Sequence, residues 1–238
     1  MAAGVGVSCV YSHVFKYICK VQRPWVKNPA VKPLEKALPN AGGYSFPSGH
    51  SARAGAVWGS FGIESYRESK SLLLLLTGLV ISLAVAFSRL FLGVHSVKDV
   101  IAGLFMAYAV FFAAGFLLDW AERGRNRDVA VSLLLFLICF LPMLRFGCIS
   151  TAGFGIGVSV SWPLERRFLH FKDAESNKER AERFIIGSAG IILIRFWLNA
   201  FLSSFIPVRY CGFFCQFAAA FYILFAFPFA FTKIKKNQ

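Results

Sequence analysis

The sequence predicts an all-α, polytopic transmembrane bundle of about eight helices. Of its 238 residues, 57% are hydrophobic, whereas a soluble domain usually has about 45–50% apolar residues. Several uncharged stretches approach the roughly 20 residues that a helix needs to cross the hydrocarbon core of a bilayer. The alternating pattern of a membrane barrel is absent from the sequence, so the backbone groups inside lipid must be satisfied within helices.

The candidate spans follow one another along the chain. Five of them carry no charge, and they are Ser71–Ser88, Val100–Leu118, Val129–Leu144, Phe146–Leu164 and Tyr210–Thr232. A sixth, Phe184–Pro207, is interrupted only by Arg195, and two shorter candidates are Ala2–Tyr17 and His50–Tyr66. His50–Tyr66 is amphipathic and rich in Gly, Ala and Ser. Because such small residues let helix backbones approach closely in lipid, we expect this helix inside the bundle.

The chain has a formal net charge of +14 and six cysteines. Lys and Arg in a membrane protein chiefly set topology and contact lipid headgroups, so we expect a bilayer and no nucleic acid as partner. The cysteines lie in or beside apolar segments without metal-ligand spacing, which indicates small buried hydrophobic residues. The sequence also has no Asp-rich cluster. We therefore predict no metal and no cofactor.

Three short polar blocks stand among the apolar stretches: Lys16–Pro24, Pro47–His50 and Ser88–Asp99. Polar residues near a bilayer are costly and are typical of functional sites. When the predicted helices are traced in order, all three blocks fall on the same membrane face. The first block follows helix one, the second begins helix two, and the third lies between helices three and four. We therefore expect the blocks to form one site.

The cations of these blocks suit a phosphoryl group, whose nonbridging oxygens must be neutralised during cleavage. Lys16, Arg23 and Arg89 would clamp these oxygens, because Arg forms forked bonds and Lys acts as a point charge. Ser48 and Gly49 stand at the start of a predicted helix. Their backbone N–H groups and the Ser48 hydroxyl would therefore meet the same anion at a helix N-terminus, where glycine permits a close approach.

The histidines predict a nucleophile and a general acid. His95 and Asp99 are spaced i, i+4, which puts both on one helical face. The Asp99 carboxylate would accept the Nδ1–H of His95 and leave Nε2 free to attack phosphorus. His50 would then donate a proton to the leaving oxygen. The three cations would supply the charge that a metal supplies in other phosphatases.

Each block alone is common, since a Pro-Ser-Gly-His sequence usually marks a turn before a helix. Together and in this order, they resemble the signature of the type 2 phosphatidic acid phosphatase (PAP2) family, which spans residues 16–99 and matches at every position. The resemblance implies that His95 forms a phosphohistidine with help from Asp99, and that His50 protonates the leaving group. It also implies a phosphate site made of Lys16, Arg23, Ser48, Gly49 and Arg89.

The resemblance further implies a PAP2-like catalytic core over residues 1–128, followed by C-terminal transmembrane helices over residues 129–238. Two features depart from the family pattern. Family members usually have helices before the first block, so we expect either that upstream helices are missing or that the start of the chain has been assigned too late. The C-terminal helices resemble the branch near glucose-6-phosphatase and the sphingosine-phosphate phosphatases.

Positive charge predicts the orientation of the bundle. The face opposite the blocks carries fourteen Lys and Arg residues, and the face with the blocks carries seven outside the expected ligands. The fourteen are Arg67, Lys70, Arg123, Arg125, Arg127, the six within Arg166–Arg183, Lys233, Lys235 and Lys236. Because cytoplasmic loops are enriched in Lys and Arg, we expect the blocks outside. This predicts an integral protein of a bacterial inner membrane with a periplasmic site, or a luminal site in a eukaryote.

Two further arginines have more than one interpretation. Arg53 lies one turn after His50, so contact with the substrate headgroup and a hydrogen bond between helices are about equally expected. Arg195 lies in the middle of a span, where a charge suggests a functional role by default. Its distance from the blocks in sequence favours pairing within the bundle.

The leading hypothesis is an integral membrane phosphatase that hydrolyses a lipid phosphate or an isoprenoid (di)phosphate through a phosphohistidine. Phosphatidate, phosphatidylglycerol phosphate, undecaprenyl diphosphate, lipid A and sugar phosphates all fit this chemistry. One alternative is vanadate-dependent haloperoxidase-like activity, which the apolar spans disfavour because that branch of the family is soluble. Another is a non-catalytic scaffold or lipid-transport protein, which the intact His50, His95 and Asp99 disfavour. The sequence makes no prediction about oligomeric state.

Overall fold

The computed structural model describes residues 2–124 and 126–236, so Arg125, one of the fourteen charges counted above, lies outside the described residues. The described residues form helices and loops without β-strands, and they make eight long helices when segments joined by π-helical turns are counted together. The all-α prediction is therefore confirmed. The segments of the first half are α1 (Ala2–Cys19), α2 (Pro24–Lys27), η1 (Glu35–Asn40), α3 (Gly49–Ala54), η2 (Gly55–Gly59), α4 (Ser60–Ser69), α5 (Leu72–Phe91) and α6 (Val97–Glu122).

The second half continues in the same way, with α7 (Arg127–Phe146), α8 (Ile149–Phe168), α9 (Asn177–Leu193), η3 (Ile194–Leu198), α10 (Asn199–Ser203), α11 (Val208–Phe221), η4 (Tyr222–Ala226) and α12 (Phe227–Lys236). The segments η2, η3 and η4 are π-helical turns inside otherwise continuous helices. Such turns occur as local bulges within α-helices. They join α3 to α4, α9 to α10 and α11 to α12.

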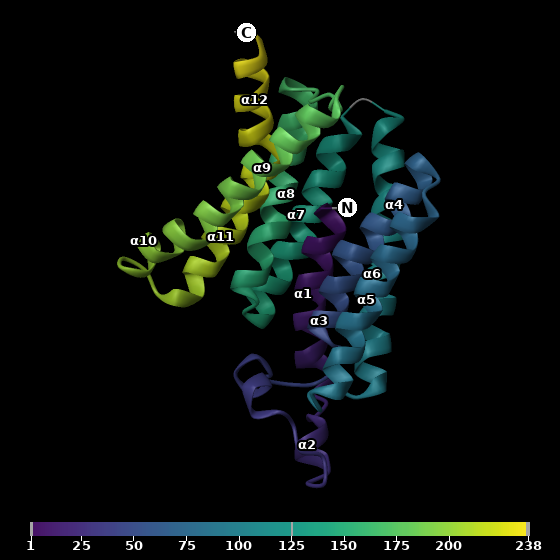
Figure 1. The fold of residues 1–238 in the computed structure, drawn as a ribbon. Helices are drawn as coiled ribbons and strands as arrows, with labels where there is room; N and C mark the ends of the chain where they lie inside the picture. The colour runs from purple at the N-terminus through teal and green to yellow at the C-terminus, as the bar shows by residue number, and fades with distance from the viewer. Residues whose placement is uncertain (1, 125, 237–238) are drawn as a thin grey trace. The chain divides into compact units, whose positions relative to one another are not determined.

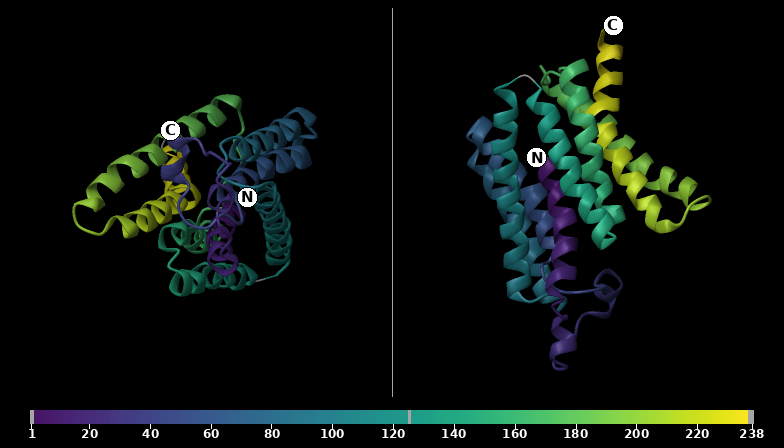
Figure 2. Two further views of the ribbon diagram at one scale, coloured as in Figure 1. Left: turned by 90° about the horizontal axis from the view of Figure 1, so that it is seen from below. Right: turned by 180° about the vertical axis from the view of Figure 1, so that it is seen from behind.

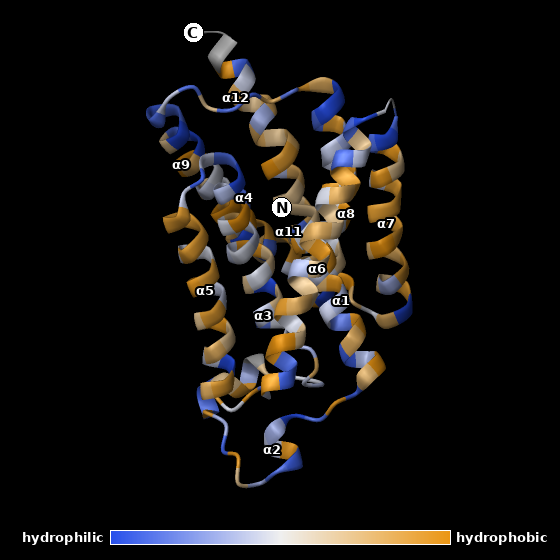
Figure 3. Ribbon diagram, turned by 90° about the vertical axis from the view of Figure 1, so that its right-hand side faces the viewer, coloured by the Kyte–Doolittle hydropathy of each residue, from blue (hydrophilic) through white to orange (hydrophobic). Residues whose placement is uncertain are grey.

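Five helices among the described residues are long and apolar enough to cross a membrane: Leu72–Phe91, Val97–Glu122, Arg127–Phe146, Asn177–Ser203 and Val208–Ile234. Figure 3 shows hydrophobic colour along most of α5 and α7, with hydrophilic colour at helix ends and around α2. The other three predicted spans are also helical, in α1, α3–η2–α4 and α8. They are not among the helices that are long and apolar enough to cross a membrane. The chain is an integral membrane protein with a polytopic helical fold.

The chain divides into two compact units, Ala3–Leu117 and Leu118–Gln238, and their boundary falls within α6 (Figure 1). The functional boundary expected at residue 128 stays a prediction. Within the second unit α8 packs against both α7 and α11. Gly153 and Gly157 of α8 lie against the backbone of Phe213 and Phe217, so small residues set this close packing.

Small residues also bring helices together within the first unit. A side chain at Gly78 of α5 would meet the Trp58 carbonyl oxygen and the Cα atom of Gly62. Ser71 caps α5 by accepting a hydrogen bond from the Leu74 N–H, as N-cap serines commonly do. The tight hairpin of α4 and α5 returns the chain to the end of the unit where α3 begins.

The end of the first unit that holds the polar blocks is built from four chain segments. α1 ends there at Cys19, α3 begins at Gly49, and α5 and α6 are joined there by a short turn with Gly93 at φ +68°. Such a positive φ suits glycine. The long loop between α1 and α3, which carries α2 and η1, lies at the same end of this unit (Figures 1 and 2).

Candidate active site

The second and third polar blocks are joined through their backbones. The Ser48 N–H donates a 2.8 Å hydrogen bond to the Asp99 carbonyl oxygen. A side chain at Gly103, one turn after Asp99 on α6, would collide with the Ser48 carbonyl oxygen. The absence of a side chain there lets α6 lie directly against the N-terminus of α3. These two contacts place the start of α3 beside the start of α6.

A cavity of about 330 Å³ opens among the three blocks. Five of the eight predicted site residues line it, namely Lys16, Arg23, Gly49, His50 and His95, and six others complete the lining: His13, Tyr17, Gly42, Gly43, Tyr44 and Arg53. Both imidazoles expected to do chemistry therefore face one space. Asp99, Ser48 and Arg89 are not part of the cavity lining.

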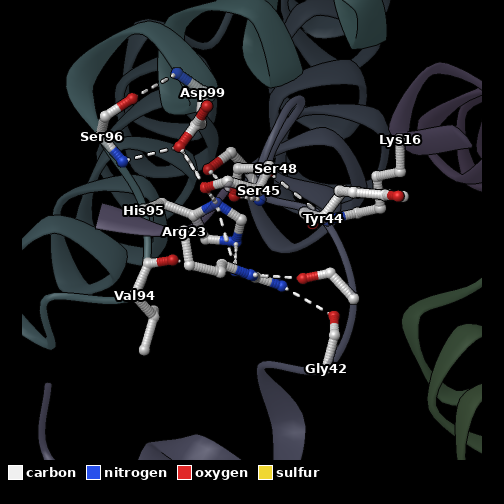
Figure 4. Close-up of polar contacts among 12 residues, drawn as sticks. Lys16, Arg23, Gly42, Tyr44, Ser45, Ser48, Val94, His95, Ser96 and Asp99 are labelled. Carbon is white, nitrogen blue, oxygen red and sulfur yellow. Dashed lines mark hydrogen bonds and ion pairs between the residues drawn. The ribbon is translucent and has the colours of Figure 1, made fainter. Parts of the chain in front are cut away.

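Asp99 lies behind His95 and is almost completely buried (Figure 4). Its Oδ2 atom accepts hydrogen bonds from the Ser45 hydroxyl at 2.6 Å and from the Ser96 N–H at 2.7 Å. His95 Nδ1 lies 3.5 Å from the same oxygen, which is longer than the roughly 2.7–3.2 Å of a typical N–H···O bond. Nδ1 is also 3.3 Å from the Ser45 hydroxyl oxygen. Asp99 and Ser45 together therefore contact the Nδ1 side of the imidazole.

Arg23 connects the loop to the predicted nucleophile. Its Nη1 donates to the Val94 carbonyl oxygen at 2.8 Å and lies 2.9 Å from His95 Nε2. Its Nε and Nη2 donate to the carbonyl oxygens of Gly43 and Gly42 at 3.1 and 3.0 Å. Arginine has no acceptor atom, so the contact with Nε2 requires a lone pair on that nitrogen. Nε2, expected to be free, instead lies against the Arg23 guanidinium.

Lys16 reaches the same loop from the end of α1. Its ammonium group donates to the carbonyl oxygens of Tyr44 and Ser45 at 2.7 and 3.4 Å (Figure 4). The Ser45 N–H in turn donates to the Val21 carbonyl oxygen at 2.7 Å. Both cations of the first block therefore hold the Gly42–Ser45 segment at the cavity. They do so with N–H groups of the kind that bind phosphate oxygens in other proteins.

Ser48 and Arg89, unlike Lys16 and Arg23, do not line the cavity. The Ser48 side chain is fully buried and caps α3, accepting hydrogen bonds from the N–H and the hydroxyl of Ser51 at 3.3 and 2.9 Å. Arg89 donates to the Ser88 hydroxyl from Nε and Nη2 at 3.1 and 3.0 Å. Burial lowers the pKa of His50 to about 4, and the charge of Arg89 adds to this lowering. The phosphate-binding roles of both residues stay predictions.

His95 lies in the turn between α5 and α6, and its charge state follows from burial. Its side chain is almost fully buried, and this desolvation lowers the pKa of His95 below the ordinary value. The contact with Asp99 raises the pKa of His95, whereas the charges of Arg23 and Lys16 lower it. Burial dominates because it penalises the charged imidazolium. The neutral imidazole, the form that can attack phosphorus, is therefore favoured.

Sequence reasoning missed Ser45. Ser45 precedes the second block by two residues, and its position next to that block was the only available signal. Gly42 and Gly43 were expected only to form a turn. Arg53, for which two kinds of contact were expected, lines the cavity and lies beside the Cys9 thiol. No group of three or more His, Cys, Asp or Glu side chains that could hold a metal occurs in the described part of the chain.

Arg195 lies in η3 and is exposed on a helix that is not buried within the structure. Its charge acts on the Cys215 thiol of α11, and none of the ion pairs found among the described residues includes it. The pairing expected for Arg195 within the bundle stays a prediction.

The fold and the site define an integral membrane protein with two imidazoles, a buried carboxylate and several cations at one cavity. Comparison with known proteins identifies its class. Residues 1–123 match the PAP2 superfamily, and residues 149–238 match the PAP2 superfamily phosphatase transmembrane extension. The first match covers more than half of the chain. The chain belongs to the PAP2 superfamily.

One curated relative is phosphatidylglycerophosphatase B of Bacillus subtilis (strain 168). It is 32% identical over 99 residues, which are 39% of this chain and 47% of the relative. The chain therefore spans about half the length of the curated relative that it matches. No solved structure matches the chain.

Proposed function

We propose that this protein is a membrane phosphatase that hydrolyses a lipid phosphate or an isoprenoid (di)phosphate. The observation that carries this proposal is the convergence of His50, His95, Lys16 and Arg23 on one cavity, with Asp99 behind His95. Membership of the PAP2 superfamily and the likeness to a phosphatidylglycerophosphatase support it. Residues 1–128 would carry the chemistry, and residues 129–238 would add membrane helices to that core.

The proposed reaction has two steps. In the first, His95 Nε2 attacks phosphorus, and the N–P bond forms as the bond from phosphorus to the lipid oxygen breaks. His50 must be protonated at this step, a form that the negative charge of the bound phosphate favours, and it gives its proton to that leaving oxygen. In the second step water attacks the phosphohistidine while His50 takes a proton from it. The O–P bond forms, the N–P bond breaks, and inorganic phosphate leaves with both histidines restored.

The contacts of Arg23 and Lys16 suit a role in charge neutralisation. Arg23 Nη1 lies 2.9 Å from His95 Nε2, so an oxygen of a phosphate bound at Nε2 would lie within reach of the same guanidinium. Arg23 would then exchange its contact with Nε2 for the phosphate oxygen and leave the lone pair for attack. Lys16, Arg89 and the N-terminus of α3 would neutralise the remaining charge.

We further propose that the site faces the outside of the membrane. The excess of Lys and Arg in the loops opposite the blocks supports this orientation. In a bacterium the site would lie on the periplasmic face of the inner membrane, and in a eukaryote on the luminal face.

The proposal is tested by His95→Ala in the purified full-length protein, with phosphate release measured from phosphatidate, phosphatidylglycerol phosphate and a prenyl diphosphate. Loss of the nucleophile is expected to lower turnover by about 1,000-fold or more. His170→Ala serves as the matched control, because His170 is exposed in the second unit and is not among the residues that line the cavity. Unchanged turnover in a folded His95→Ala protein would contradict the mechanism.

A further inference from the structure

Arg53 is a cation on the cavity wall that none of the proposed steps uses. It lies in the last turn of α3, is exposed, and lines the same cavity as Lys16 and Arg23. Lys16 and Arg23 each donate hydrogen bonds to backbone carbonyl oxygens. None of the ion pairs found in the described part of the chain includes Arg53. Its guanidinium instead lies beside the Cys9 thiol.

Arg53 lies deeper in the helical bundle than the reacting groups. α3 begins at Gly49 and runs away from the site end of the first unit. Because a helix rises about 1.5 Å per residue, the backbone of Arg53 lies about 4–5 Å further from that end than the backbone of His50. Contacts with α1 agree with this level. Gly49 lies beside the Ser12 hydroxyl, whereas Arg53 lies beside Cys9, nearly one turn further from the site end of α1.

The charge of the cavity exceeds what one phosphate requires. Its lining includes Lys16, Arg23 and Arg53 and contains no acidic residue, since Asp99 is buried behind His95. A phosphate monoester carries about two negative charges. Lys16, Arg23 and Arg89, the proposed ligands of the cleaved phosphate, already match that charge. Arg53 is left as a cation on the bilayer side of the reacting phosphate.

We propose that Arg53 binds a second phosphate of the substrate, on the lipid side of the phosphate that is cleaved. This rests on the proposed function. With the outer phosphate against His95, the rest of a lipid substrate must run toward the bilayer, past the level of Arg53. A phosphodiester reached through a short polyol, or the inner phosphate of a diphosphate, would lie there and accept forked hydrogen bonds from the guanidinium. A lipid with one phosphate has no group for Arg53.

The test compares Arg53→Gln with wild type on three substrates in mixed micelles: phosphatidylglycerol phosphate, farnesyl diphosphate and phosphatidate. We expect kcat/KM to fall about tenfold or more for a substrate with two phosphates, and less than about twofold for phosphatidate. Arg53→Lys, which keeps the charge but loses the fork, is expected to lie between. Arg67→Gln removes the same charge from the other end of this helix and should leave all three substrates unchanged.

The substrate arms separate the sources of the second phosphate. If kcat/KM falls only for phosphatidylglycerol phosphate, Arg53 binds a phosphodiester. If it falls only for farnesyl diphosphate, Arg53 binds the inner phosphate of a diphosphate. Either result supports the proposal. An equal loss on all three substrates, or no loss on any, overturns it. If Arg53→Gln does not fold, the same comparison with Arg53→Lys decides.

Failure of the proposed function would look different. Wild-type protein that releases phosphate from none of the three substrates would overturn the phosphatase assignment and the role of Arg53 with it. Wild-type protein that is active, with an Arg53→Gln variant that treats all three substrates as wild type does, would overturn the role of Arg53 alone.

Discussion

The Ser45 hydroxyl donates a 2.6 Å hydrogen bond to Oδ2 of Asp99, and both side chains are almost completely buried. Ser45 also lies 3.3 Å from His95 Nδ1. The carboxylate that faces the proposed nucleophile is therefore held by a residue outside the three polar blocks. Groups that hold a catalytic carboxylate in this way commonly affect activity without touching the substrate.

Ser45→Ala tests this positioning role. Loss of the hydroxyl is expected to lower kcat by about 10–100-fold with little change in KM, because the proposed phosphate ligands stay in place. Asp99 Oδ2, released from Ser45, would interact more strongly with His95 and raise the pKa of that imidazole. The acid limb of the pH profile of kcat/KM should therefore move to higher pH.

Ser45→Thr is the matched control for that variant, because it keeps the hydroxyl and should recover most of the lost kcat. The pH profile separates positioning from simple packing. A fall in kcat with an acid limb at the wild-type pH would contradict the proposed effect of Ser45 on His95.

The wild-type pH profile is a second prediction. His95 must be neutral to attack, and burial lowers the pKa of His95 below the ordinary 6.5. The loss of activity that depends on His95 should therefore begin only as the pH falls through this lowered pKa, which places the acid limb of kcat/KM below pH 6.5. The same shift makes the His95 contribution to stability decrease as the pH falls from the ordinary pKa to the lowered one. An acid limb of kcat/KM assigned to His95 at or above the ordinary value would contradict this prediction.

Metal removal and vanadate give a third prediction. Lys16, Arg23 and Arg89 are proposed to neutralise the phosphoryl oxygens, so EDTA should leave phosphate release unchanged. Vanadate adopts the five-coordinate geometry of the transition state and should inhibit competitively. Strong inhibition by EDTA, relieved by a divalent cation, would show that the cations alone do not supply the charge.

Gly78→Ala is expected to destabilise the first unit. The added Cβ would meet the Trp58 carbonyl oxygen and lie 2.9 Å from the Cα atom of Gly62, and both atoms belong to backbone that cannot turn aside. Overpacking of this kind costs about 1–3 kcal/mol. The midpoint of thermal unfolding in detergent should therefore fall.

Gly115→Ala provides the control for Gly78→Ala, since a Cβ at Gly115 of α6 would have no atom within 4 Å. Alanine has a higher helix propensity than glycine, so this variant should unfold at the wild-type temperature or slightly above. Equal effects of the two substitutions would mean that helix propensity, and not the contact between α4 and α5, decides the result.

Much of the fold follows from local sequence properties. The long apolar runs predict α5, α6 and α7, and the Pro47–His50 block predicts the start of α3, because span length and capping chemistry depend on neighbouring residues. The sequence also brings His50 and His95 to one end of the bundle through the alternation of crossings. This last inference needs only the number of helices between the two residues.

The remaining features of the site depend on contacts between segments far apart in sequence. Ser45 contacts Asp99 because the loop after η1 folds back over the start of α6, and no local pattern specifies that path. Arg23 bonds to backbone carbonyl oxygens, which every residue possesses, so the sequence gives no sign of these partners. Arg89 turns toward its neighbour Ser88, a choice of side-chain conformation that spacing cannot predict.

The hydrogen bond from the Ser48 N–H to the Asp99 carbonyl oxygen joins two blocks through main-chain atoms alone. No side-chain substitution at either position deletes that donor or that acceptor, except one to proline at Ser48. The frame of the cavity is in this respect independent of the side chains that line it. Evolution can therefore exchange wall residues such as Arg53, and with them the preferred headgroup, while the reacting histidines keep their mutual placement.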